Sequence, residues 1–144
     1  MNKTEYSSLV KKESPGSKWY MNIPKAFIFG GIICCIGEAF RQLYLFLDLS
    51  DVVAGSFTSM TMVFIGAFLT GIGVYDNLGK HGGAGTAVPI TGFANSIVSP
   101  AMEYKTEGLV MGVGAKMFTV AGPVIVYGVI SSVIVGILHY IQSL

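Results

Sequence analysis

Apolar and polar positions divide the chain into a polar start and three long apolar runs, with a glycine-rich stretch before the last run. The first run, residues 23–47, is roughly 37 Å long as a helix and so crosses a ~30 Å hydrocarbon core with some tilt. A second run, residues 57–75, is also long enough to span. The pattern predicts an all-α, polytopic membrane protein, with a polar tail over residues 1–22 and a single integral membrane domain over residues 23–144.

The glycine-rich stretch, GKHGGAGTAVPITGFANS over residues 79–96, cannot cross a bilayer simply. Gly82, Gly83 and Gly85 disfavour a helix, and lipid tolerates non-helical backbone only where protein or water satisfies its polar groups. We therefore expect a re-entrant or pore-lining turn here. Pro89 then marks the start of a new helix.

The same stretch carries the positive groups Lys80 and His81. A glycine-rich backbone before a helix N-terminus can hold an anion through free N–H groups and the helix dipole, and neighbouring cations strengthen that attraction. The alternative is that the glycines only allow tight turning and close helix approach.

The helix that begins at Pro89 is expected to run to about residue 107 and to carry a polar side chain at every fourth position. Steps of four residues drift by about 40° each, which predicts one slowly winding polar stripe that lines water. Pro100 removes a backbone bond to Ser96 and predicts a kink. The stripe consists of Thr91, Asn95, Ser99, Glu103 and Glu107.

The last apolar run, residues 109–141, is too long for one unbroken span. Gly122 and Pro123 predict a break, and hence a broken C-terminal helix. The pattern leaves open whether residues 109–122 cross the membrane, dip in and out, or continue the last helix through a kink.

Charged residues give the orientation and mark one pair inside the first run. Lysines precede that run, whereas the connection after it carries Asp48 and Asp51 and no Lys or Arg, which predicts a cytoplasmic N-terminus. Glu38 and Arg41 lie three residues apart, on one helical face, where each neutralises the other. Either Arg41 extends to the outer interface with Glu38 as its partner, or the pair belongs to a solute path.

Composition excludes several other classes of protein. Hydrophobic residues make up 52% of the chain and charged residues 12%, which is more apolar than a small soluble domain. The net charge of +1 lacks the basic footprint of a nucleic-acid binder. The motifs include no nucleophile elbow, P-loop or metal cluster, so we expect neither an enzyme nor a cofactor.

The first two runs contain a weak internal repeat. With an offset of 36 residues, Gly30 aligns with Gly66 and Gly37 with Gly73. Transporter folds are often built from repeats, but matching glycines also arise from helix packing alone.

One long ordered string, GVYDNLGKHGGAGTAVPITGFANSIVSPAMEYKTEGLVMGVGAKMF, resembles the small membrane subunits of the SpoVA sporulation family. The resemblance extends over nearly the whole chain from about Trp19 onward, and the polar tail favours the AC-type subunit over the shorter AE-type relative. It implies a protein of the inner membrane of the developing spore. The family is associated with moving dipicolinic acid, as the calcium chelate, into and out of the spore core.

The resemblance also implies a soluble, dipicolinate-binding AD-type subunit and the AE-type membrane subunit as partners, in an oligomer surrounded by membrane lipid. It transfers no residue that contacts the solute, so the candidate path rests on side-chain chemistry. We expect a channel or translocation subunit, gated by membrane tension or by partner subunits; the alternative is a non-conducting scaffold that anchors the dipicolinate-binding partner. The candidate path residues are Glu38, Arg41, Asp76, Lys80, His81, Gly82, Gly83, Gly85, Thr91, Asn95, Ser99 and Glu103.

Overall fold

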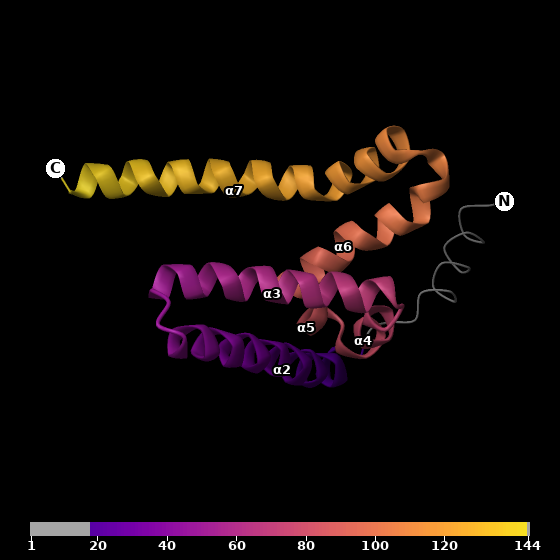
Figure 1. The fold of residues 1–144 in the computed structure, drawn as a ribbon, viewed down its shortest axis with the longest axis horizontal. Helices are drawn as coiled ribbons and strands as arrows, with labels where there is room; N and C mark the ends of the chain where they lie inside the picture. The colour runs from indigo at the N-terminus through magenta and orange to yellow at the C-terminus, as the bar shows by residue number, and fades with distance from the viewer. Residues whose placement is uncertain (1–17, 144) are drawn as a thin grey trace.

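The computed structural model describes residues 18–143, and every regular element within them is helical (Figure 1). Three helical stretches are long and apolar enough to cross a membrane: Trp19–Phe46, Asp51–Gly71 and Leu109–Gln142. The predicted all-α, polytopic class is therefore confirmed. The expected polar tail over residues 1–22 lies mostly outside the described residues.

Helices α2 (Trp19–Phe46) and α3 (Asp51–Gly71) form a hairpin with a short connection (Figure 1). The expected start of the second span, at residue 57, was six residues too late. Ser50 has an extended backbone that suits the residue before a helix, and Asp51 places a negative charge in the first turn, where the helix dipole favours it. Ser56 and Thr58 are accommodated because their hydroxyls donate to backbone carbonyls one turn earlier.

The glycine-rich stretch forms a re-entrant segment built from α4 (Tyr75–Gly82), α5 (Ala84–Ala87) and α6 (Ile90–Glu103). Helix α5 packs on α2 about 16 Å along that helix, where Gly85 faces Gly30. Helix α6 then leads back to the end of the hairpin where α4 began (Figure 1). The expectation that glycines keep this stretch non-helical was wrong for Gly82 and Gly85; the helices break instead at Gly83 and Pro89.

Pro100 lies inside α6, and after the end of α6 the helical winding becomes first tighter and then wider than that of an α-helix. A 3₁₀-helix, η1 (Tyr104–Glu107), is followed by a π-helix, η2 (Leu109–Gly114), with Gly108 at a φ of 96° between them. The helix expected to reach residue 107 therefore ends as an α-helix at Glu103. A left-handed φ at Gly108 suits glycine because it has no Cβ.

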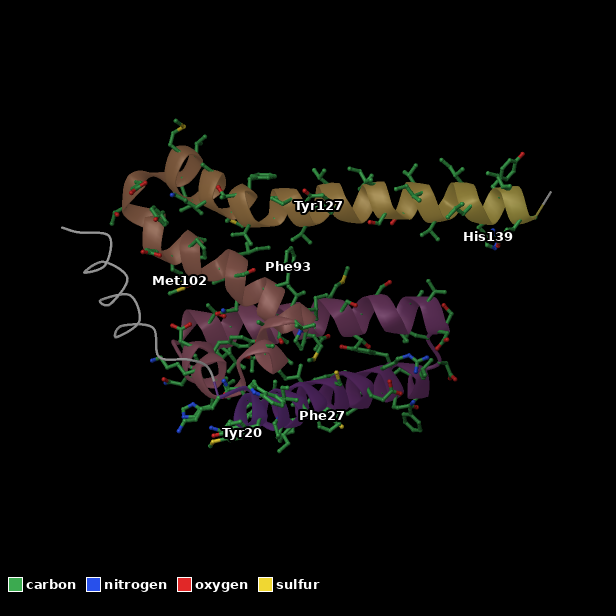
Figure 2. All side chains as sticks on the ribbon, turned by 180° about the vertical axis from the view of Figure 1, so that it is seen from behind. Tyr20, Phe27, Phe93, Met102, Tyr127 and His139 are labelled. Atoms are coloured by element: carbon green, nitrogen blue, oxygen red, sulfur yellow. The ribbon has the colours of Figure 1, made fainter. Side chains whose placement is uncertain are left out.

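Helix α7 (Ala115–Gln142) is continuous through Pro123, so the predicted break at Gly122 and Pro123 was wrong. A proline removes one backbone hydrogen bond, here to the Thr119 carbonyl, whereas ending the helix in an apolar setting leaves several polar groups unpaired. A continuous helix therefore costs less free energy than a broken one. The helix contacts α6 and η2 but has no buried residue, and Figure 2 shows its side chains projecting from both edges.

Candidate solute-binding site

A partly open cavity of about 380 Å³ lies between the first turns of α2 and the end of α4. Four residues of the glycine-rich stretch that the sequence singled out come together in its wall. They are positioned there because α4 ends at Gly82, and Gly83 turns the chain with φ 51° and ψ −125°, a conformation open to glycine. The lining residues are Trp19, Asn22, Ile23, Ala26, Lys80, His81, Gly82, Gly83 and Ala84.

The charge in this first cavity comes from side chains in the last turn of α4. His81 Nδ1 lies 2.8 Å from the Asn77 carbonyl oxygen. A carbonyl oxygen only accepts, so Nδ1 carries the proton and donates. With the Lys80 ammonium beside it, the site suits an anion.

The expected contribution of a helix N-terminus to anion binding was wrong for this cavity. Lys80 and His81 lie at the C-terminal end of α4, where the helix dipole is negative, and α5 has only four residues. The attraction for an anion therefore depends on the two side chains.

A second cavity, of about 520 Å³, lies between the re-entrant segment and the start of α7. It brings Asn95 and Ser96 of α6 together with Val120 and Val124 of α7. Gly83 lines both cavities, and the position that a Cβ would occupy there has no atom within 4 Å. The two cavities thus approach each other at a residue without a side chain.

A buried network of hydrogen bonds connects Tyr75, Thr86 and Thr91 within the re-entrant segment. The Tyr75 hydroxyl is 2.7 Å from the Thr86 carbonyl oxygen, to which it donates, and 2.8 Å from Thr91 Oγ1. Tyr75 lies beyond the end of α3 and is only 3% exposed. Burial raises the pKa of its phenol, and the hydrogen bond with Thr91 lowers it, so the phenol stays protonated at neutral pH.

One further position of the predicted polar stripe, Asn95, is also engaged within the protein. Asn95 Oδ1 lies 2.9 Å from the hydroxyl oxygen of Thr70 on α3. Thr91 is buried in the network and lines neither of these two cavities. The stripe is therefore divided between a packed part and, at Asn95, a part that reaches the second cavity.

Glycines are required where the re-entrant segment touches its neighbours. A Cβ on Gly85 would fall on the Ala26 backbone, and one on Gly66 would lie 2.8 Å from the Thr91 carbonyl oxygen. Gly30 faces α5 and Gly66 faces α6, so both members of the aligned pair are points of close backbone approach. Helix packing thus accounts for a glycine at both positions, Gly30 and Gly66, without an internal repeat.

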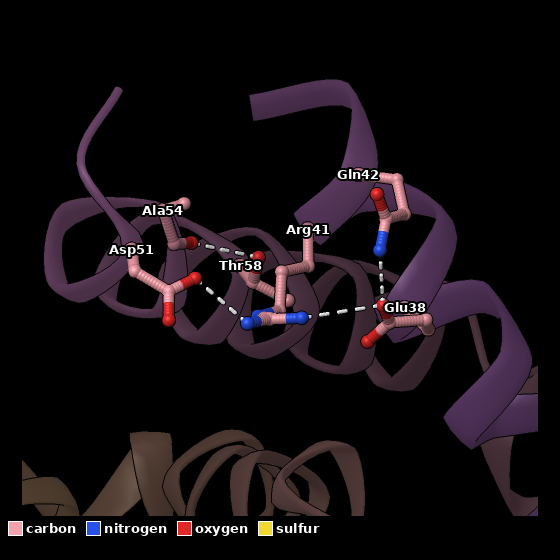
Figure 3. A network of polar contacts seen from close by, with 6 residues as sticks. All are labelled: Glu38, Arg41, Gln42, Asp51, Ala54 and Thr58. Atoms are coloured by element: carbon pink, nitrogen blue, oxygen red, sulfur yellow. Dashed lines mark hydrogen bonds and ion pairs between the residues drawn. The ribbon is translucent and has the colours of Figure 1, made fainter. Parts of the chain in front are cut away.

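Glu38 and Arg41 lie towards the end of α2 that leads into α3, and they line neither cavity (Figure 3). The predicted pair is confirmed, with Arg41 Nη1 3.3 Å from Glu38 Oε1. Arg41 Nη2 also lies 2.7 Å from Asp51 Oδ1, and Gln42 Nε2 lies 2.6 Å from Glu38 Oε1. This cluster ties the end of α2 to the start of α3.

The three remaining predicted residues lie outside both cavities. Asp76 is exposed in the first turn of α4, Ser99 is half-buried on α6, and Glu103 is exposed at the end of α6.

Sequence reasoning missed Asn22 and Tyr75 as residues that line the two cavities. Tyr75 belongs to the YD pair of the ordered string, and this pair was the one feature of the sequence that could have drawn attention to it.

The fold and these cavities define a polytopic helical membrane protein with three candidate spans and a re-entrant segment beside a cationic cavity. Within this class, the profile of the SpoVAC/SpoVAEB sporulation membrane proteins matches residues 22–138, and the chain belongs to that family. It is similar to stage V sporulation protein AC of Bacillus subtilis (strain 168), with 48% identity over 139 residues, covering 96% of this chain and 93% of the relative. No solved structure matches it.

Proposed function

We propose that the chain is a translocation subunit that moves dipicolinate, as the calcium chelate, across the inner membrane of the spore. The observation that carries this proposal is the approach of two cavities at Gly83, one of them lined by Lys80 and His81. Dipicolinate carries two carboxylates, which suit the Lys80 ammonium and, in its protonated form, the neighbouring His81 imidazole. A cavity of about 380 Å³ is within the range of small-molecule sites.

The calcium of the chelate calls for oxygen ligands, which the second cavity offers through Asn95 and Ser96. In this scheme the solute is held first at Lys80 and His81, then passes Gly83 towards Asn95. By the distribution of lysines, the first cavity faces the cytoplasm, which in the spore is the core.

The rest of the path comes from other chains. The second cavity is bounded by Val120 and Val124 of a helix whose own surface is unburied, which leaves room for partner subunits. We propose the AE-type membrane subunit and the soluble AD-type subunit as these partners, in an oligomer within the lipid bilayer.

The test is release of dipicolinate from liposomes that contain the full chain with the AE-type subunit. Replacing Lys80 and His81 together by Gln should lower flux about tenfold or more, because a charge-assisted hydrogen bond contributes about 1.5 to 3 kcal/mol. The matched control replaces Lys105 and His139, which lie outside both cavities, by Gln. Equal flux from the two double variants would refute the assignment.

A non-conducting scaffold is the second candidate. It is favoured by hydrogen bonds between polar side chains of the chain itself, Thr70 with Asn95 and Tyr75 with Thr91. Polar groups that bond to one another need no water path. A scaffold would bind the AD-type subunit with unchanged affinity after the Lys80 and His81 substitutions and would give no flux before them. Flux from the unmodified subunits would eliminate this alternative.

A further inference from the structure

An apolar cavity of about 300 Å³ lies between α2 and α3 and shares Tyr75 and Thr86 with the second cavity. Its wall includes Phe29 and Ile33 of α2 and Met62 and Ile65 of α3, and the re-entrant segment contributes Thr86 and Thr91. Both threonine hydroxyls already bond within the protein, and no buried side-chain oxygen or nitrogen among the described residues lacks a partner. Water needs two to four polar partners to enter, so this cavity excludes it.

The cavity adjoins a groove on the outer face of α2. Ile32 and Ile36 line it, and both also line a shallow apolar groove that passes Phe27, Ile28 and Gly31. The position of a Cβ on Gly31 is open, which keeps the floor of the groove low, and Phe27 projects beside it (Figure 2). In a membrane this face of α2 meets acyl chains.

A positive charge stands at the head of the groove. Lys25 lies three residues before Ile28 and seven before Ile32, which places all three on one face of α2. Lys25 has no ion pair within residues 18–143. From Lys25 to Ile36 the helix rises about 16 Å, close to half of the ~30 Å hydrocarbon core and thus to the depth of one leaflet.

We infer that this groove and cavity form a binding site for one anionic phospholipid of the bilayer. Its phosphate pairs with Lys25, and one acyl chain follows the groove and inserts its end past Ile32 and Ile36 into the cavity. A dry apolar cavity of about 150 Å³ already binds benzene, so one twice that size accommodates a correspondingly longer hydrocarbon segment. The inserted chain then contacts Thr86 and Thr91, which links lipid occupancy to the re-entrant segment.

The experiment uses the full chain in vesicles of phosphatidylglycerol and phosphatidylcholine, with a trace of phosphatidylglycerol that carries a photoreactive diazirine near the end of one acyl chain. After illumination, mass spectrometry should find the label concentrated on residues 31–36 and 62–69, about tenfold above residues 124–141 of the exposed helix α7. An even distribution of label over the three segments would overturn the proposal. This map needs no variant and no transport measurement, so its outcome is independent of the proposed solute path.

Two variants with matched controls sharpen the test. Ile65→Phe fills the cavity and should lower labelling about tenfold, whereas Ile137→Phe on α7 should leave it unchanged. Lys25→Gln should abolish the preference for labelled phosphatidylglycerol over labelled phosphatidylcholine, and Lys105→Gln should preserve it. Equal labelling of the two Phe variants, with equal melting temperatures, would contradict insertion, and an unchanged preference in Lys25→Gln would contradict the phosphate contact.

Discussion

Replacing Gly85 by Ala tests the packing that positions the re-entrant segment. Gly85 lies in α5 against α2, and a Cβ there would come closer than 3.0 Å to three backbone atoms of Ala26. Side chains can rotate away from such a clash, but the backbone of α2 cannot. Helix α5 must therefore move away from α2, and the wall of the first cavity moves with Gly83 and Ala84.

The magnitude follows from the nature of the contact. Overpacking that neighbouring side chains can relieve costs about 1 to 3 kcal/mol, and a clash with backbone belongs at the upper end of that range. For a chain of this length, about 3 kcal/mol corresponds to a fall in melting temperature on the order of 10 °C. The matched control is Gly79→Ala in α4, where nothing lies within 4 Å of the new methyl group and the change should be neutral or stabilising by up to about 1 kcal/mol.

The assay is thermal unfolding of the purified protein in detergent, followed by far-ultraviolet circular dichroism. The expected result is a large loss of melting temperature for Gly85→Ala and none for Gly79→Ala. If both variants had the melting temperature of the unmodified protein, α5 would not be packed on α2 as described. The reasoning about the wall of the first cavity would then also be refuted.

Three further substitutions test other contacts by the same assay. Tyr75→Phe should cost about 1 to 3 kcal/mol because it leaves Thr86 and Thr91 without their hydroxyl partner, whereas Tyr127→Phe on exposed α7 should cost nothing; equal melting would contradict the network. Asp51→Asn should cost less than about 1 kcal/mol, because its ion pair with Arg41 is exposed; a larger loss would show that this pair is shielded from water. Pro123→Ala should leave helicity unchanged and raise the melting temperature, since the new amide can bond to the Thr119 carbonyl; a fall in helicity would support a break at Pro123 after all.

The parts of the fold that sequence predicts well are those fixed by local pattern. The first span was placed within a few residues because an uninterrupted apolar run determines it, and the Glu38–Arg41 pair followed from spacing on one helix. Asp51, the other partner of Arg41, was assigned to a loop because polar residues before an apolar run read as a connection. The hydroxyl of Ser56 bonds to its own helix, so a polar residue that hydropathy reads as a connection is accommodated inside α3.

The grouping of the candidate residues was predicted to the extent that they are contiguous in sequence. Lys80, His81 and Gly83 share one cavity wall because they are neighbours along the chain. The contribution of Trp19 could not be foreseen, since it depends on how α4 packs against the start of α2, which no local pattern specifies. The same holds for Val120, which faces Asn95 across the second cavity only because α7 folds back over α6.

The polar stripe shows what intramembrane polarity does and does not indicate. A row of polar residues on one helix face predicts water only if those residues lack other partners. Here Thr91 bonds to Tyr75 and Asn95 to Thr70, so the first two members of the stripe also act as joints between helices. Lys80 differs, because its side chain is exposed at a cavity wall and makes no ion pair within residues 18–143. Charge at a cavity wall is therefore the stronger support for the proposed solute path, and a hydroxyl or amide on a helix face is the weaker support.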